Sequence, residues 1–161
     1  MSLHIKKLTN MSLNQSSRPK DHILVIFGAT GDLTKRKLMP ALFELEALKM
    51  LPEKFLILGI GRSSISVSDF REHNRTVLKN AYNRAKDQTY IKRFLERLFY
   101  LQADTQGEEA YMALNEKLQL LREQSSMQNF NLIFYLSTPP SLYEIIPRLL
   151  AKATLNEESE G

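Results

Sequence analysis

The feature that most constrains the fold is an alternation of short apolar runs with longer segments of helical periodicity. Four runs are apolar almost throughout: residues 23–27, 55–60, 99–102 and 131–136. A strand that is covered on both faces of a parallel sheet has this continuous apolar character, whereas a half-exposed strand alternates. The sequence therefore predicts an α/β fold, a doubly wound parallel sheet of about four buried strands.

Segments with an amphipathic pattern fill the intervals between these strands. We expect helices from Leu38 to Leu48, after a cap at Ser66 or Ser68, and over residues 89–98, 108–123 and 141–153. The last helix contains Pro147, which can kink it. One domain over residues 21–155 is expected, with a flexible leader over residues 1–20 and a polar tail over residues 156–161.

The composition excludes several classes of protein. Without cysteine, neither a disulfide framework nor a thiolate metal site is expected, and a cytoplasmic location fits. The three histidines have no ligand-like spacing. The net charge of +4 comes from basic residues interleaved with acids, as in residues 92–97, which indicates solvated helix faces rather than a nucleic-acid surface. No apolar run approaches the ~18 residues of a membrane span, and no secretory signal follows the first residues, so we expect no membrane partner.

The most informative stretch joins the first predicted strand to the first helix, and it reads GATGDLTKRK over residues 28–37. A glycine turn at this place is where a Rossmann sheet receives a dinucleotide: Gly28 lets the backbone approach the pyrophosphate and Gly31 lets helix and strand pack closely. Backbone N–H groups at the start of the helix then face the anion. Only two glycines of the usual three are present, so a plain strand-to-helix turn remains an alternative. A Walker A loop is excluded because no second glycine precedes a lysine.

Charges near the two strand ends favour a phosphorylated ligand. Lys35, Arg36 and Lys37 fall in the first turns of the helix, where each cation is unfavourable by ~0.3–1 kcal/mol unless an anion is bound nearby. The second strand runs into Gly61 and Arg62 without the acid that holds a ribose 2′-hydroxyl in NAD-binding proteins. An arginine there can pair with a 2′-phosphate, which predicts NADP; a mere surface arginine is the alternative.

Three stretches resemble glucose-6-phosphate dehydrogenases, in that family's order and spacing, and the resemblance covers about residues 22–153. They are residues 28–42 (GATGDLTKRKLMPAL), residues 59–63 (GIGRS) and residues 134–144 (FYLSTPPSLYE). The resemblance implies a Rossmann-like sheet with NADP contacts from Gly28, Ala29, Thr30, Gly31, Asp32, Leu33, Thr34, Lys35, Arg62 and Tyr143. It also implies that Lys37 points towards the junction of cofactor and substrate, and that Asp32 starts a helix rather than acting as an acid. For Tyr143 a core position is an equal alternative.

The resemblance further implies a homo-oligomeric parent enzyme that oxidises glucose 6-phosphate to 6-phosphogluconolactone, in the pentose phosphate pathway, with hydride transfer to NADP. The family's Glu-Lys-Pro-Phe-Gly and Asp-His-Tyr-Leu-Gly-Lys motifs, which carry the substrate lysine and the general base, do not occur in this sequence. No catalytic residue is therefore assigned, and we expect the chain alone to be inactive. Residues 131–136 are also expected at an open edge of the sheet, because the family's fifth strand is absent from the sequence.

Two other functions are compatible with a nucleotide-binding turn. The first is a non-catalytic nucleotide-binding or interaction module. The second is a reductase of the extended Rossmann type, which carries a Tyr-x-x-x-Lys pair near the fourth strand; here Pro147 stands four residues after Tyr143, which disfavours it.

Overall fold

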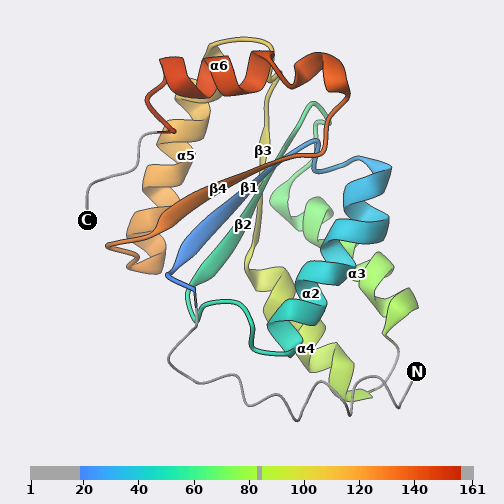
Figure 1. Ribbon diagram of the computed structural model, residues 1–161. Helices are drawn as coiled ribbons and strands as arrows, with labels where there is room; N and C mark the ends of the chain where they lie inside the picture. The colour runs from blue at the N-terminus through green and yellow to red at the C-terminus, as the bar shows by residue number, and fades with distance from the viewer. Residues whose placement is uncertain (1–18, 83–84, 157–161) are drawn as a thin grey trace.

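The centre of the molecule is a parallel four-stranded sheet with the strand order β3-β2-β1-β4 (Figure 1). The structure, a computed structural model, describes residues 19–82 and 85–156, so the expected leader and tail lie almost wholly outside the described residues. The strands are β1 (His22–Phe27), β2 (Phe55–Gly61), β3 (Leu98–Gln102) and β4 (Asn131–Leu136). From β1 the chain steps through β2 to β3 and then crosses to the other side of β1, which confirms the doubly wound α/β fold.

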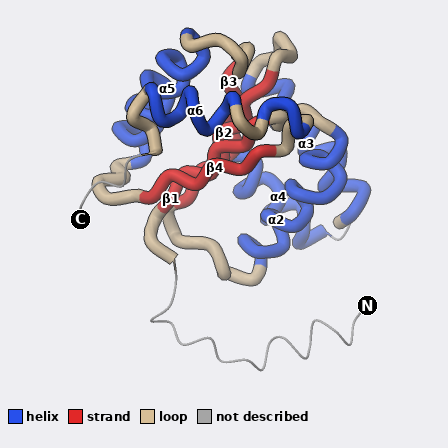
Figure 2. The backbone as a smooth tube through the Cα atoms, turned by 45° about the horizontal axis from the view of Figure 1, so that its top comes forward, coloured by secondary structure: helices blue, strands red, loops and turns tan. Residues whose placement is uncertain are grey.

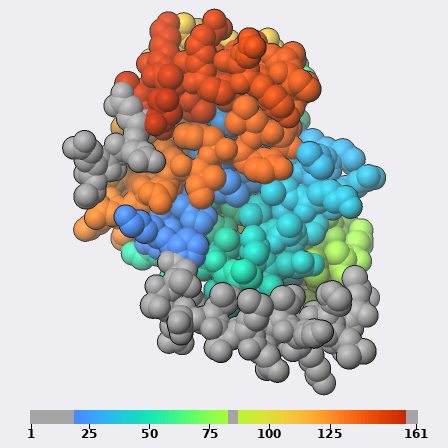
Figure 3. Space-filling model, in the orientation of Figure 1, coloured from blue at the N-terminus to red at the C-terminus, as the bar shows by residue number. Residues whose placement is uncertain are grey.

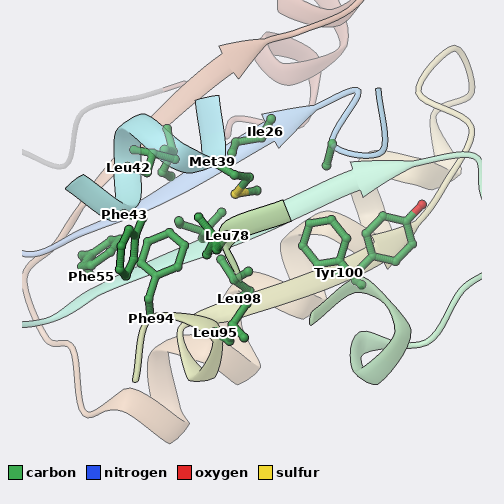
Figure 4. Close-up of a cluster of buried hydrophobic side chains, with 14 of the residues drawn as sticks. Ile26, Met39, Leu42, Phe43, Phe55, Leu78, Phe94, Leu95, Leu98 and Tyr100 are labelled. Atoms are coloured by element: carbon green, nitrogen blue, oxygen red, sulfur yellow. The ribbon is translucent and has the colours of Figure 1, made fainter. Parts of the chain in front are cut away.

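Helices cover both faces of the sheet (Figure 2). One face is covered by α2 (Met39–Ala47), α3 (Val67–Ala81) and α4 (Ala85–Glu96), the other by α5 (Glu109–Ser125) and α6 (Ile145–Lys152). All six residues of β1 are buried, and they alternate between two apolar clusters: Leu24 and Ile26 face α2 to α4, whereas Ile23, Val25 and Phe27 face α5 and α6. Figure 4 shows the first cluster, in which the rings of Phe43, Phe55 and Phe94 lie together. Burial on both faces explains the continuous apolar run of β1.

The first helical segment begins with an irregular turn. Residues Asp32 and Leu33 are helical, and a π-helical turn, η2 (Thr34–Leu38), follows and leads directly into α2. The Met39 N–H donates to the Thr34 carbonyl, five residues back. Pro40 comes next; it has no N–H to donate and its ring clashes with the carbonyl four residues earlier, so the wider turn accommodates it.

The start of α3 shows which of the two candidate serines is the cap. The Ser66 hydroxyl accepts the Asp69 N–H at 3.0 Å, and the Asp69 carboxylate accepts the Ser66 N–H at 3.1 Å, which is a complete capping box. Hydrogen bonds from Ser66 hold the pKa of the Asp69 carboxyl below its usual value. Ser66 therefore ends the loop that follows β2 and fixes where α3 begins.

Four expectations from the sequence were wrong in detail. β4 is the expected edge strand, but it is not continuously buried: Ile133 and Tyr135 remain 44% and 40% exposed. The last helix does not run over residues 141–153, because a 3-10 turn, η3 (Pro140–Leu142), precedes α6. Pro147 lies in the first turn of α6, where an N–H has no intrahelical partner, so it causes no kink. Helix α4 also lies several residues earlier than expected, since Leu98 already belongs to β3.

The described residues contain neither a membrane-spanning helix nor a cluster of metal ligands. None of their helices has the length and apolar character needed to cross a bilayer. No three histidine or acidic side chains within residues 19–82 and 85–156 converge in a way that could hold a metal ion.

Candidate functional site

The carboxyl ends of the parallel strands lie at one end of the sheet, and the loops that leave them carry most of the predicted site residues. The strand order reverses at β1: β2 and β3 lie on one side of it and β4 lies on the other. β4 is parallel to β1 and paired with it from His22↔Asn131 to Phe27↔Leu136. In open α/β sheets, ligands bind in the crevice outside such a reversal point. The turn after β1, residues 28–31, lies at that place.

Gly28 is required by the geometry of this turn. Its φ is +79°, a left-handed conformation that side chains disfavour, and an added Cβ would lie 2.1 Å from the Ser137 carbonyl oxygen. The Ser137 N–H in turn donates to the Phe27 carbonyl at 2.9 Å, which holds the end of β4 against the turn. Gly28 therefore allows the turn and the end of β4 to approach one another at this end of the sheet.

Several residues of the turn are used by the fold itself. The N–H groups of Gly28 and Ala29 both donate to the Ile60 carbonyl, at 3.0 and 3.1 Å. The Thr34 side chain is fully buried, and its hydroxyl donates to the Gly28 carbonyl at 3.2 Å. Ala29 is 1% exposed. Cofactor contacts from Ala29 and Thr34 thus stay a prediction, and the structure shows that both residues also stabilise the turn.

The start of the following helix presents the groups that an anion needs. The helix begins at Asp32, so its first N–H groups have no intrahelical acceptor. Asp32 forms a helical ion pair with Arg36 at 3.3 Å, as a helix-start residue can, and this pair neutralises one of the three cations. Lys35 and Lys37 have no acid within 4 Å among the described residues. Two cations that no described acid pairs with therefore remain near the start of this helix, and Lys35, in its first turn, lies at the positive end of the helix dipole.

Arg62 lies directly after β2, on an exposed turn beside the first one. Among the described side chains no acid pairs with it, and no acid occurs in the sequence between Gly61 and Ile65. The two turns touch, since the hydroxyls of Thr30 and Ser63 are 3.3 Å apart. An exposed guanidinium that no described acid pairs with, next to the Gly28 turn, is an arrangement suited to a 2′-phosphate.

Tyr143 and Lys37 are both on the surface. The Tyr143 side chain is 50% exposed, which excludes the alternative of a core position. It follows η3, in the loop between β4 and α6 at the same end of the sheet (Figure 1). Lys37 is exposed within η2. The cofactor contact of Tyr143 and the substrate side of Lys37 are still predictions.

Sequence reasoning missed the residues that support the Arg62 turn from β3. The Tyr100 hydroxyl donates to the Ser63 carbonyl at 2.9 Å, and the Ala103 N–H donates to the Gly61 carbonyl at 2.9 Å. A Cβ on Gly61 would lie 2.8 Å from the Tyr100 oxygen, and a Cβ on Gly59 would lie 2.6 Å from that of Ala29. The two glycines of β2 could have indicated this contact, because a glycine inside a strand often marks a place where another group packs closely against the backbone.

Residues 25–161 match the family model for the NAD binding domain of glucose-6-phosphate dehydrogenase. The chain belongs to the glucose-6-phosphate dehydrogenase family. The family and the fold expected from the sequence are thereby confirmed.

Individual members of the glucose-6-phosphate dehydrogenase family agree with this assignment. The chain is 43% identical over 138 residues to the glucose-6-phosphate 1-dehydrogenase of Treponema pallidum, covering 85% of this chain and 27% of that protein. It is 40% identical over 139 residues to the enzyme of Aggregatibacter actinomycetemcomitans, covering 86% and 27%.

Solved structures of the family have the same fold. The glucose-6-phosphate 1-dehydrogenase of Mycobacterium avium superposes with a TM-score of 0.72 at 32% identity, covering 86% of this chain and 28% of that one. A glucose-6-phosphate dehydrogenase in complex with its substrate glucose 6-phosphate superposes with a TM-score of 0.76 at 31% identity, covering 89% and 29%. The chain spans about a quarter of the length of these relatives.

Proposed function

We propose that this chain binds NADP at the carboxyl ends of β1, β2 and β4, over the Gly28 turn. We further propose that it is the cofactor-binding part of an enzyme that oxidises glucose 6-phosphate to 6-phosphogluconolactone. The observation that supports NADP most directly is that Arg62 is exposed, pairs with no described acid, and lies on a turn that contacts the Gly28 turn through Ser63 and Thr30. The cytoplasmic location and homo-oligomeric state expected for the complete protein belong to the same proposal.

The residues present fit the cofactor. Arg62 binds the 2′-phosphate with two charge-assisted hydrogen bonds. The N–H groups that start the helix at Asp32, together with Lys35, bind the pyrophosphate. Tyr143 contacts the cofactor from the loop after β4, and Lys37 orients the phosphorylated sugar beside it. The bound nicotinamide supplies the hydride acceptor, whereas this chain supplies binding and orientation.

The experiment that tests the cofactor is a comparison of NADP and NAD binding by calorimetry in the intact chain and in Arg62→Ala. Each charge-assisted bond contributes at most about 1.5–3 kcal/mol, and exposure to solvent lowers the net value, so the Kd for NADP is expected to rise about 10–100-fold while that for NAD changes less than about twofold. Arg93→Ala is the matched control, because Arg93 is another exposed arginine without an ion pair to any described residue, and it lies beside Glu46, Glu53 and Tyr90 at the opposite end of the sheet.

Two outcomes would contradict the proposal. If Arg62→Ala weakened NAD as much as NADP, the side chain would support the turn instead of recognising the phosphate. If neither affinity changed, Arg62 would have no part in cofactor binding. Binding of NADP without any oxidation of glucose 6-phosphate by the complete protein would favour the non-catalytic module.

A further inference from the structure

The backbone on either side of Arg62 is held by β3, whereas the Arg62 side chain itself makes no ion pair with any described residue. On one side, the Gly61 carbonyl accepts the Ala103 N–H at 2.9 Å. On the other side, the Ser63 carbonyl accepts the Tyr100 hydroxyl at 2.9 Å and the Ile65 N–H at 3.1 Å. Arg62 is thus an exposed side chain on a clamped section of backbone.

Tyr100 is itself rigidly placed. It is 5% exposed, and its ring packs on Phe70 with 5.1 Å between the ring centroids. In Figure 4 its hydroxyl points away from the phenylalanine cluster. Gly61 leaves the space through which the phenol reaches Ser63, since any Cβ there would lie 2.8 Å from the phenol oxygen. The hydrogen bond therefore depends on a buried ring and an adjacent glycine, both specific to this place.

We infer that Tyr100 is a positioning residue for 2′-phosphate recognition: its hydroxyl fixes the Ser63 carbonyl and thereby the direction in which Arg62 leaves the turn. This inference rests on the proposed binding of NADP. A guanidinium forms two parallel bonds with a phosphate only in a narrow range of geometries, so the backbone that carries it affects affinity. The Ser63 hydroxyl, 3.3 Å from Thr30, adds a second tie from the Gly28 turn.

The test uses two ligands that differ only in the phosphate, 2′,5′-ADP and 5′-AMP, titrated against the intact chain. Tyr100→Phe keeps the ring and removes the hydroxyl. The Kd for 2′,5′-ADP is expected to rise about threefold to tenfold, and that for 5′-AMP is expected to change less than about twofold, because loss of one hydrogen bond loosens the turn without removing Arg62.

Tyr111→Phe controls for a merely structural effect. Tyr111 is also buried, and its hydroxyl also donates to a backbone carbonyl, that of Thr105 at 2.9 Å, but on the face of the sheet covered by α5. Tyr111→Phe is expected to lower stability to a similar degree and to leave the ratio of the two dissociation constants unchanged. A similar change of the ratio in both variants would overturn the inference.

The decisive arm is Tyr100→Phe in the Arg62→Ala background. If Tyr100 acts through Arg62, the second substitution adds less than about twofold to the Kd for 2′,5′-ADP. If it adds the same factor as in the parent chain, Tyr100 acts by another route and the inference is wrong. A parent chain that binds 2′,5′-ADP no better than 5′-AMP would instead refute the proposed cofactor, so the two failures are distinguishable.

Discussion

Gly28→Ala is expected to be among the most destabilising single-methyl additions in this chain. Two costs add up at this residue. A side chain at φ +79° costs about 1–2 kcal/mol in the left-handed region. The new Cβ also meets the Ser137 carbonyl oxygen at 2.1 Å, and overpacking of this kind costs about 1–3 kcal/mol. The carbonyl cannot move away freely, because the Ser137 N–H is hydrogen-bonded to Phe27 and β4 is paired with β1 along its length.

The two costs together are about 2–5 kcal/mol, which is a large share of the ~5–15 kcal/mol that stabilises a typical domain. Urea unfolding followed by circular dichroism measures it. At a slope of about 2 kcal/mol per M, the midpoint should fall by about 1–2.5 M with the slope unchanged. A shift of this size reports the fold alone, without any ligand.

Gly31→Ala is the matched control, three residues away in the same turn. Gly31 has no positive φ, and its added Cβ would approach only the Gly28 carbonyl, at 3.1 Å. We expect it to cost about 1 kcal/mol or less, because Gly31 precedes the helix without a left-handed backbone and its Cβ would meet a single carbonyl oxygen. If Gly31→Ala lowered the midpoint as much as Gly28→Ala, the left-handed turn and the close approach of β4 would not explain why glycine is required at residue 28.

Three further predictions follow from other parts of the structure. Burial raises the pKa of Tyr111 to about 12 from its ordinary value of 10.0. The neutral phenol therefore contributes fully to stability below about pH 10, and this contribution is lost as the pH rises towards 12. Urea midpoints across that range should fall less in Tyr111→Phe than in the parent. The edge strand β4 reaches the surface (Figure 3, orange) with exposed apolar side chains, so it should promote self-association at high concentration. Light scattering should show less self-association in Ile133→Lys. The control Leu120→Lys, which places the same charge on an exposed helix residue, should show no decrease. The chain alone should produce no NADPH from glucose 6-phosphate above the blank, because no general base is assigned in it; turnover by a preparation free of host enzyme would contradict this.

The parts of the fold that the sequence predicts well are those with two-sided burial. Apolar runs identify β1 and β2 because both strands lie inside the sheet. The same pattern misjudges β4: Ile133 and Tyr135 are as apolar as the residues of β1, yet no helix of the described chain covers their face. An apolar run specifies a strand, but not which of its faces the rest of the chain covers.

The candidate site divides in a similar way. Gly28 and Arg62 can be identified from the sequence, because a turn glycine and an arginine in place of an acid each carry a chemical meaning. Tyr100 cannot, since its role depends on a hydrogen bond to a residue 37 positions earlier in the chain. Local sequence patterns do not encode such a contact, and only the missing side chain at Gly61 indicated that another side chain packs there.

The strand order also has a consequence for how the protein forms during synthesis. β1 leaves the ribosome before the other described strands, yet its second neighbour, β4, begins more than 100 residues later. At about 5–20 residues per second, β1 waits roughly 5–20 s with one edge unpaired. Its six residues, HILVIF, combine high β-propensity with no proline or glycine, the composition of segments that aggregate when exposed. The nascent chain is therefore most vulnerable in the interval before β4 arrives, when β1 to β3 and their helices can already pack but the centre of the sheet is still open on one side.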